Sequence, residues 1–94
     1  MAYTKEQRAV WRKERHRKTR ELIDMAKNVP CRDCGVVYPP YVMDFDHVRG
    51  SKMFNIGQSI SETAPIDSII NEISKCEVVC SNCHRIRTHQ RNHR

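Results

Sequence analysis

Long apolar runs are missing from this sequence of 94 residues. Its apolar stretches span only a few residues each, which excludes a membrane-crossing helix of about 20 apolar residues. Residues 1–13 also lack the apolar segment of a secretory signal, so we expect a cytoplasmic protein. In that compartment the five cysteines are expected to stay reduced, which favours metal binding over disulfides.

Acidic residues are absent from residues 80–94, which carry four arginines. Residues 1–28 carry nine Lys or Arg against four acidic residues, whereas residues 29–79 carry four basic against seven acidic residues. The net charge of +6 is therefore concentrated at the two ends, around a mildly acidic middle. This distribution is typical of a protein that binds a polyanion and also holds divalent cations.

A chain of this length forms one small domain with a thin core, and such domains often require a metal or a disulfide for stability. Two Cys-x-x-Cys pairs, Cys31/Cys34 and Cys80/Cys83, supply the four sulfur ligands that structural zinc prefers. We therefore predict a four-cysteine Zn²⁺ site. The fifth cysteine, Cys76, is expected to be a small buried apolar residue, and the rival interpretation is that it replaces one of the four ligands.

Glycine and proline are absent between Thr4 and Pro30, and most residues there are good helix formers. A capping-box pattern at Thr4 and Gln7 predicts the start of a helix, and Pro30 predicts its end. Apolar residues lie only near the two ends, so we expect only the ends to dock on a core. The middle is either a solvated face or a nucleic-acid contact, and its lopsided charge favours the contact. The residues expected to contact DNA are Arg12, Arg15 and Lys18.

The alternating pattern of residues 41–48 predicts a β-strand with Asp44 and Asp46 on one face and His47 on the other. Asp46 and His47 converge on one site only if the strand ends or kinks at this point. Residues 49–52, which contain a glycine, supply such a break.

The remaining elements are predicted to be short. Residues 36–38 and 53–56 are candidate strands. Residues 85–94 contain no breaker and predict a basic helix, for which Ser81 or Asn82 is the expected cap. A helix is predicted over residues 65–75, with Glu72 facing solvent. Its core-facing stripe would consist of four isoleucines at helical spacing, Ile66, Ile69, Ile70 and Ile73.

Three side chains have the chemistry that hydrolysis requires. Asp46 offers a hard oxygen ligand for Mg²⁺ or Mn²⁺, and His47 can accept a proton from water near neutral pH. His84 directly follows the second cysteine pair, so a zinc site would fix its position on the last helix. Structural roles stay open, because a hydrogen bond at a strand end explains Asp46 and His47, and a surface position explains His84.

Four short motifs occur in an order that resembles the zinc-knuckle, phage-type branch of the HNH endonucleases. They are Cys31-x-x-Cys34, Asp46-His47, Cys80-x-x-Cys83-His84-Arg85 and Arg87-Thr88. The resemblance covers about residues 31–90 and implies a small α+β fold, in which a ββα-metal core is stapled by the four-cysteine zinc site. It divides the chain into a basic N-terminal helix at residues 1–29 and a nuclease domain at residues 30–94.

The resemblance implies that His47 is the general base and that Asp46 and His84 hold the catalytic Mg²⁺ or Mn²⁺. The implied reaction is hydrolysis of DNA phosphodiester bonds, in which one active site nicks one strand. The family's middle Asn, which tethers the loop that carries the base, normally lies nine residues before the final His, and Lys75 stands at that position here. Basic residues near the site are candidates for phosphate contacts: Arg85, Arg87, Arg49 and Lys52.

Two other functions stay open. The chain is alternatively a non-catalytic zinc-ribbon protein that binds nucleic acid, in which Asp46 and His47 are structural. A third possibility is an accessory factor in a phage packaging or mobile-element assembly. The expected partners are DNA, such an assembly and a second copy in a homodimer, with no membrane. If a phage encodes the chain, the expected compartment is the cytoplasm of the host cell.

Overall fold

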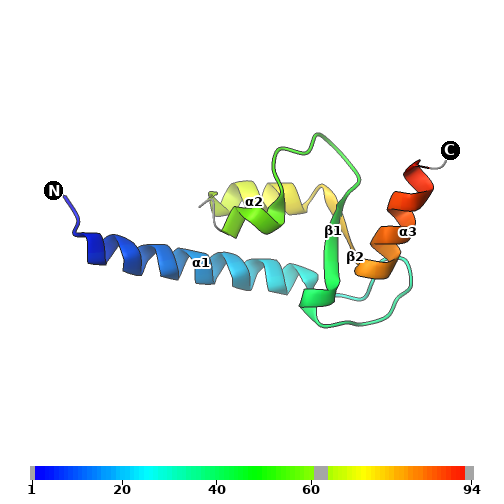
Figure 1. Cartoon of the computed structure of the whole chain (residues 1–94), viewed down its shortest axis with the longest axis horizontal. Coiled ribbons are helices and arrows are strands. Elements are labelled where there is room, and N and C mark those ends of the chain that lie inside the picture. Colours follow the sequence, from blue (N-terminus) through cyan, green and yellow to red (C-terminus); the bar gives the residue numbers. More distant parts are fainter. Residues whose placement is uncertain (1, 61–63, 93–94) are drawn as a thin grey trace.

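The computed structural model describes residues 2–60 and 64–92, which form a small α+β protein with three α-helices and a two-stranded sheet. A long N-terminal helix extends away from the sheet (Figure 1), and the molecule measures 57 × 27 × 17 Å. The elements in chain order are α1 (Lys5–Lys27), a 3-10 helix (Pro40–Val42), β1 (Met43–His47), a second 3-10 helix (Ile56–Ile60), α2 (Ile66–Ile73), β2 (Cys76–Cys80) and α3 (Ser81–Asn92).

The predicted N-terminal helix and its capping box are confirmed, because Thr4 accepts a hydrogen bond from the Gln7 amide and the Gln7 side chain accepts one from the Thr4 amide. Ile23, near the C-terminal end, is buried. The prediction that the first turns dock as well is wrong, since Trp11 is 50% exposed and its ring packs edge-on against Tyr3. Across residues 2–60 and 64–92, none of the helices combines the length and apolar character needed to cross a membrane.

The predicted strand over residues 41–48 is confirmed in a shorter form. Its start moves to Met43 because Pro40–Val42 forms a 3-10 turn. Its end lies at His47, as predicted, because the next two backbone amides turn and donate to the Lys75 carbonyl at 2.9 and 3.2 Å. Gly50 completes the turn with a φ of 69°, a conformation that glycine adopts without strain.

β1 and β2 pair antiparallel, with Met43 opposite Cys80 and His47 opposite Cys76. The buried core against this sheet consists of Cys31, Met43, Val79 and Cys80. Because two of these four residues belong to the predicted four-cysteine site, the apolar core and that site are one structure. This arrangement suits a chain that has little other apolar area to bury.

Neither predicted short strand forms. Residues 36–38 are irregular, and the Val36 carbonyl instead accepts from the Cys31 amide at 3.0 Å. Pairing is prevented just beyond, because Pro39 and Pro40 lack the N–H groups that a strand donates. Residues 53–56 are also irregular up to the start of the second 3-10 helix.

The helix α2 forms as predicted, but the face that it buries differs from the predicted one. Ile69 is completely buried, but Ile66 and Ile70 are 36% and 49% exposed. Glu72, predicted to face solvent, is only 1% exposed. The buried face of this two-turn helix therefore contains Ile69 and Glu72, three residues apart, and is rotated away from the isoleucine stripe.

The predicted basic C-terminal helix is confirmed, and it starts directly after β2 at Ser81, one of the two residues expected to cap it. Ser81 anchors this start, because its hydroxyl donates to the Val42 carbonyl at 2.8 Å. The last two predicted positions, residues 93–94, lie outside the described residues. The direct β2–α3 junction places the first turn of α3 beside the core cysteines.

Candidate functional site

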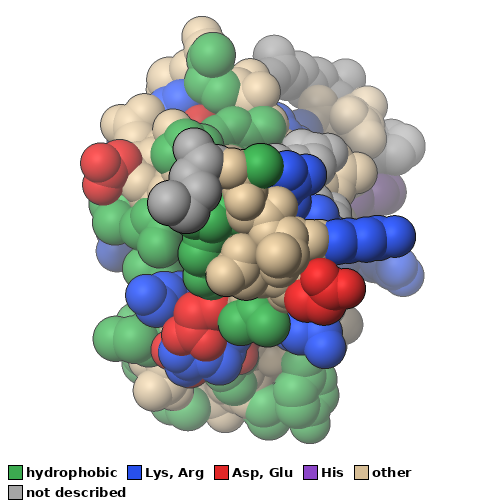
Figure 2. Space-filling view, turned by 90° about the vertical axis from the view of Figure 1, so that its left-hand side faces the viewer, with side chains coloured by type: hydrophobic (Ala, Val, Ile, Leu, Met, Phe, Trp, Pro, Cys, Tyr) green, Lys and Arg blue, Asp and Glu red, His purple; other side chains and the backbone are tan. Residues whose placement is uncertain are grey.

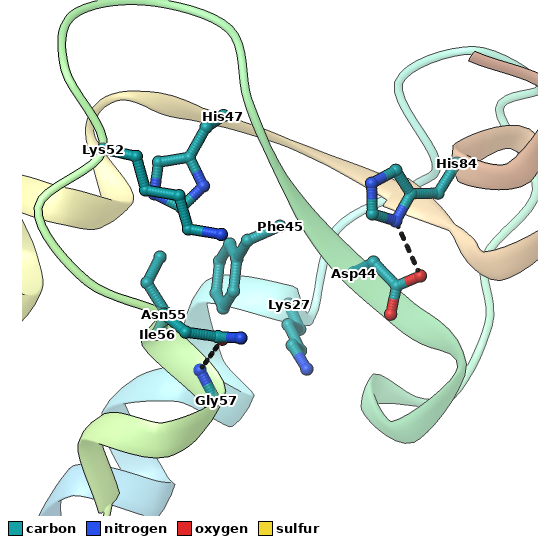
Figure 3. Close-up of a pocket in the computed structure, with 9 residues that line it drawn as sticks. All are labelled: Lys27, Asp44, Phe45, His47, Lys52, Asn55, Ile56, Gly57 and His84. Atoms are coloured by element: carbon teal, nitrogen blue, oxygen red, sulfur yellow. Dashed lines mark hydrogen bonds and ion pairs between the residues drawn. The ribbon is translucent and has the colours of Figure 1, made fainter. Parts of the chain in front are cut away.

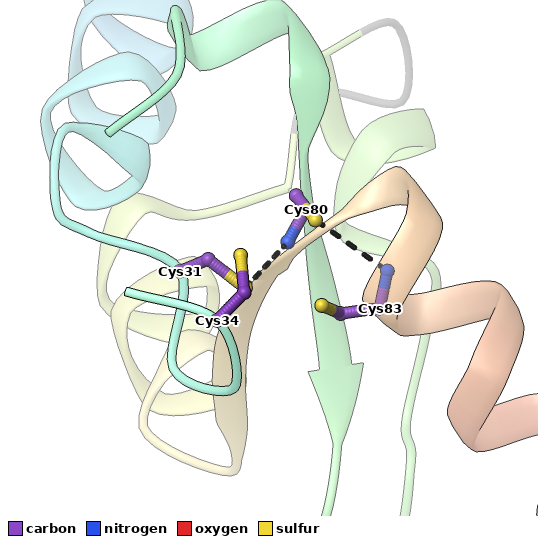
Figure 4. Close-up of side chains that lie close together, drawn as sticks. All are labelled: Cys31, Cys34, Cys80 and Cys83. Atoms are coloured by element: carbon purple, nitrogen blue, oxygen red, sulfur yellow. Dashed lines mark hydrogen bonds between the residues drawn. The ribbon is translucent and has the colours of Figure 1, made fainter. Parts of the chain in front are cut away.

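Four cysteine side chains meet beside the β2–α3 junction (Figure 4). Cys31 and Cys34 follow α1, Cys80 ends β2, and Cys83 lies in the first turn of α3. Their sulfur atoms all lie within 4.8 Å of one another, close to the ~3.8 Å expected around a tetrahedral zinc ion with ~2.3 Å bonds. The four residues can therefore hold a structural metal ion such as Zn²⁺. Within residues 2–60 and 64–92 they form the one such group of three or more candidate ligands.

The cysteines of the cluster differ in how readily they ionise. Burial opposes ionisation of Cys31, yet backbone N–H groups donate to its sulfur and together lower its pKa to about 6. The hydrogen bond that Cys83 shares with the Cys80 sulfur raises the pKa of Cys83 to about 12. A metal ion bound by the cluster would therefore have to displace the proton of Cys83, whereas Cys31 ionises more readily.

Cys76 lies outside this cluster and is only partly buried. Burial raises its pKa to about 11, and the nearby charges of Glu72 and Asp46 act in the same direction. Its thiol donates to the Glu72 carbonyl at 3.4 Å. The protonated thiol and the hydrogen bond favour the predicted role as a neutral packing residue over that of a metal ligand.

A second group of polar side chains lies where α3 crosses β1. Asp44 and Asp46 alternate onto the same face of β1, and His84 projects from the first turn of α3 above them. His84 Nδ1 lies 3.0 Å from Asp44 Oδ2, and its Nε2 lies 3.7 Å from Asp46 Oδ1. The Asp44 carboxylate accepts a hydrogen bond from Nδ1–H, and this contact turns Nε2 towards Asp46. Metal-ligating histidines are usually oriented by such a carboxylate.

Two arginines of α3 hold Asp46. Arg91 donates two hydrogen bonds to its carboxylate at 2.7 and 2.8 Å, and Arg87 donates a third at 2.7 Å. These bonds, from Arg91 above all, lower the pKa of Asp46 to about 2, although its burial acts in the opposite direction. Asp46 is therefore a carboxylate at neutral pH, with its charge balanced by arginine.

His47 points to the other side of β1, towards α2. Its Nε2 lies 2.9 Å from the Glu72 carboxylate. Glu72 also accepts from the Met53 amide at 3.0 Å and from Lys75 Nζ at 2.9 Å. Burial raises the pKa of Glu72, but Lys75, Met53 and His47 together hold it below its usual value. Glu72 is thus a buried carboxylate whose negative charge is satisfied by three donors.

Lys75, which stands where the HNH family has its middle Asn, ties down the loop after β1. Its Nζ donates to the Ser51 carbonyl at 2.8 Å as well as to Glu72. Arg49, at the start of this loop, donates to the Ser74 carbonyl at 2.5 Å. The loop is therefore fastened to the end of α2 at several points, by residues other than an Asn.

A pocket of about 300 Å³ joins the two histidine sites. Its walls include His47, Lys52, Phe45, Asp44 and His84, and in Figure 3 the β1 ribbon passes between His47 and the Asp44–His84 pair. The strand end thus brings both histidines to one pocket, although their rings point to different partners. Asp46 does not line this pocket.

The residues predicted to contact phosphate differ in whether their charges are already paired with acidic residues of the protein. Arg85 is exposed and lines a second pocket with Asp44 and His84, and Lys52 is exposed at the first pocket. Arg87, in contrast, pairs with Asp46 and with two further acidic residues, Asp33 and Glu77. Arg87 therefore acts as a clamp that joins the first cysteine loop to both strands.

The basic residues predicted on α1 lie on one exposed face of the helix. Arg12 and Arg15 line a shallow pocket with Arg8 and Trp11, and Lys18 continues the same face one turn later. Figure 2, which looks at the end of the molecule where α1 begins, shows hydrophobic and basic side chains intermixed there. Arg17 differs, since it pairs with Glu14 and Glu21 on its own helix.

The sequence assigned no functional role to three residues that the structure brings to the site, Asp44, Arg91 and Glu72. Alternation already placed Asp44 beside Asp46, and helical spacing could have placed Arg91, seven residues after His84, on the same face of α3. Glu72 had no local signal, because its partners His47 and Met53 lie far away in the sequence.

Comparisons with protein-family models, with curated proteins and with solved structures returned no match to this chain. The resemblance to HNH endonucleases therefore rests on the motif residues and on their spacing.

The cysteine site predicts a clear difference between two conservative substitutions. Cys80→Ser removes a buried ligand and is expected to reduce bound zinc from about one ion per chain to almost none, with loss of the folded circular-dichroism signal. Cys76→Ser, the matched control, should keep the ion and the fold. Metal analysis of both purified variants tests this, and zinc retained in Cys80→Ser or lost in Cys76→Ser would contradict the assignment.

Proposed function

We propose that this chain is a metal-dependent DNA endonuclease of the HNH type, in which Asp46 and His84 hold Mg²⁺ or Mn²⁺ and His47 is the general base. The observation that carries the proposal is the orientation of His84, whose Nδ1 bonds Asp44 while its Nε2 faces Asp46 Oδ1. A histidine that faces a buried carboxylate and is oriented by a second carboxylate is a common arrangement of metal ligands.

The two proposed ligands fit a small divalent cation. Two bonds of ~2.1 Å can bridge the 3.7 Å between His84 Nε2 and Asp46 Oδ1. Asp46 does not have to lose a proton first, because its pKa is about 2, and the Asp44 carboxylate orients the His84 ring through Nδ1. Asp46 must release Arg91, which is half exposed and can move into solvent. When bound, the cation would stabilise negative charge on the phosphate and on the departing 3′ oxygen.

His47 has the bonding that a general base requires. The Glu72 carboxylate accepts the proton of Nε2, so the lone pair on Nδ1 is available to take a proton from water. His47 is partly exposed at the shared pocket, so water can reach its ring. Lys52 at the pocket and Arg85 beside His84 carry positive charge suited to phosphate groups.

One active site per chain cuts one strand, so a monomer would produce nicks. The basic face of α1 would lie along the phosphate backbone, where Arg12, Arg15 and Lys18 supply affinity that does not depend on sequence. The 23-residue helix projects far enough from the sheet to contact DNA away from the cleavage site.

The second candidate function is a zinc-dependent nucleic-acid binder without catalysis. It is favoured by the three arginine hydrogen bonds on Asp46, which account for this carboxylate without an ion. In that case His84 and Asp44 form an ordinary ion pair, and the basic face of α1 is the functional surface.

Plasmid nicking distinguishes the two functions. Zinc-loaded protein with Mg²⁺ or Mn²⁺ should convert supercoiled plasmid to open circles, and His47→Ala should slow this by ~10²–10⁴-fold with DNA affinity unchanged. Gln90→Ala, at an exposed position of α3, is the control and should cut normally. A wild-type protein that never nicks with any divalent ion would establish the binder, and an active His47→Ala variant would refute the assigned base.

The DNA affinity should depend steeply on salt. Replacing Arg12, Arg15 and Lys18 together by Ala should reduce the slope of log affinity against log salt by about 2 to 3, because each lost phosphate contact releases ~0.9 fewer counterions. Arg17→Ala should change the slope little, since Arg17 already pairs with two carboxylates. Fluorescence anisotropy over a salt series measures this, and equal slopes for the triple variant and wild type would exclude α1 from the interface.

A further inference from the structure

Glu72 is a buried carboxylate at a position where an apolar side chain would be expected. It lies on a two-turn helix, is 1% exposed and carries a negative charge. A buried charge costs free energy unless it is fully paired, and an apolar side chain at this position would have avoided that cost. The retained charge therefore points to a role for its specific bonds.

The first of these bonds sets the state of His47. A carboxylate only accepts hydrogen bonds, so the 2.9 Å contact requires a proton on His47 Nε2. The neutral ring is then held in a single tautomer with its lone pair on Nδ1. Without the carboxylate, the ring could exchange tautomers and rotate about its side-chain bonds.

The other bonds place the loop after β1. One Glu72 oxygen accepts from the Met53 amide as well as from His47, and the other accepts from Lys75, which in turn donates to Ser51. Because residues 51–53 are fixed by the same carboxylate that holds the His47 ring, the loop and the ring keep a constant position relative to each other. Lys52, between the two tied residues, is thereby kept at the mouth of the pocket.

We propose that Glu72 is a positioning residue for the reaction, which fixes the tautomer and orientation of His47 and, with Lys75, the loop that carries Lys52. This inference rests on the proposed nuclease function, in which His47 accepts the proton of water. Glu72 itself touches neither substrate nor metal and acts through His47. The carboxylate of Glu72 thus takes the place of the tethering Asn that this chain lacks.

The test compares Glu72→Gln with wild type in full-length, zinc-loaded protein. Gln keeps the size of the side chain but can present its NH₂ group to the ring, which favours the wrong tautomer. We expect kcat for nicking to fall by ~10²–10⁴-fold with KM and DNA affinity within threefold of wild type. Asp67→Asn, an exposed carboxylate on the same helix, is the matched control and should change neither value.

A double-mutant cycle separates positioning from general stabilisation. If Glu72 acts through His47, then Glu72→Gln should cause almost no additional loss of activity in a His47→Ala protein. An equal loss of activity in the presence and absence of His47 would overturn the proposal. A value of kcat within threefold of wild type for Glu72→Gln would also overturn it.

Nitrogen-15 NMR of the histidine rings gives a readout that does not require cleavage. At mildly alkaline pH the wild-type His47 ring should show a single tautomer with the proton on Nε2, and Glu72→Gln should show a mixture or the opposite tautomer. An unchanged His47 signal would overturn the positioning role. If wild-type protein never nicks DNA, the proposed function fails, while this spectrum still decides whether Glu72 sets the ring.

Discussion

The meeting of four sulfur atoms at the β2–α3 junction is the constraint on which the rest of the structure depends. It joins Cys31 and Cys34 to the far end of the chain across the 45 residues 35–79. Because Cys80 ends β2 and Cys83 lies in the first turn of α3, the cluster fixes the direction in which α3 leaves the sheet. His84 follows immediately and is thereby brought above β1.

The same constraint organises the charges of α3. His84, Arg87 and Arg91 share one face of the helix, and all three reach Asp46. In the absence of a divalent ion the arginines neutralise a buried carboxylate that would otherwise be costly. A cation at Asp46 would have to compete with Arg91 for the carboxylate. The negative charge of Asp46 would then be balanced by the cation in place of Arg91. In the proposed nuclease, this competition would keep metal affinity moderate and would free Arg91 to contact a phosphate group.

Local signals predicted a large part of the fold. The capping box at Thr4, the helix-ending Pro30 and the spacing of the cysteines act over a few residues, and each of these predictions agrees with the structure. Alternation along β1 correctly placed Asp46 and His47 on opposite faces of the strand. It also explains why the Asp46 carboxylate meets the arginines of α3 while the His47 ring meets Glu72.

The remaining features depend on tertiary partners that no local pattern contains. Glu72 was expected in solvent because carboxylates usually are exposed, but His47 and Met53 supply donors from 25 and 19 residues away. The prediction that all four isoleucines of α2 face the core is wrong for a related reason. The helix has only two turns, and Glu72 occupies one of its buried positions. Residues 36–38 have strand-forming side chains but lack a neighbouring strand.

The central claim is that Asp46 and His84 together hold a divalent cation. Binding of Mn²⁺ to zinc-loaded protein, followed by electron paramagnetic resonance, tests this directly and does not require DNA or turnover. The account predicts about one Mn²⁺ site per chain that is lost in Asp46→Ala and in His84→Ala and is kept in Asp24→Ala on α1. Mn²⁺ binding that survives both site substitutions, or no Mn²⁺ binding by wild-type protein, would contradict it.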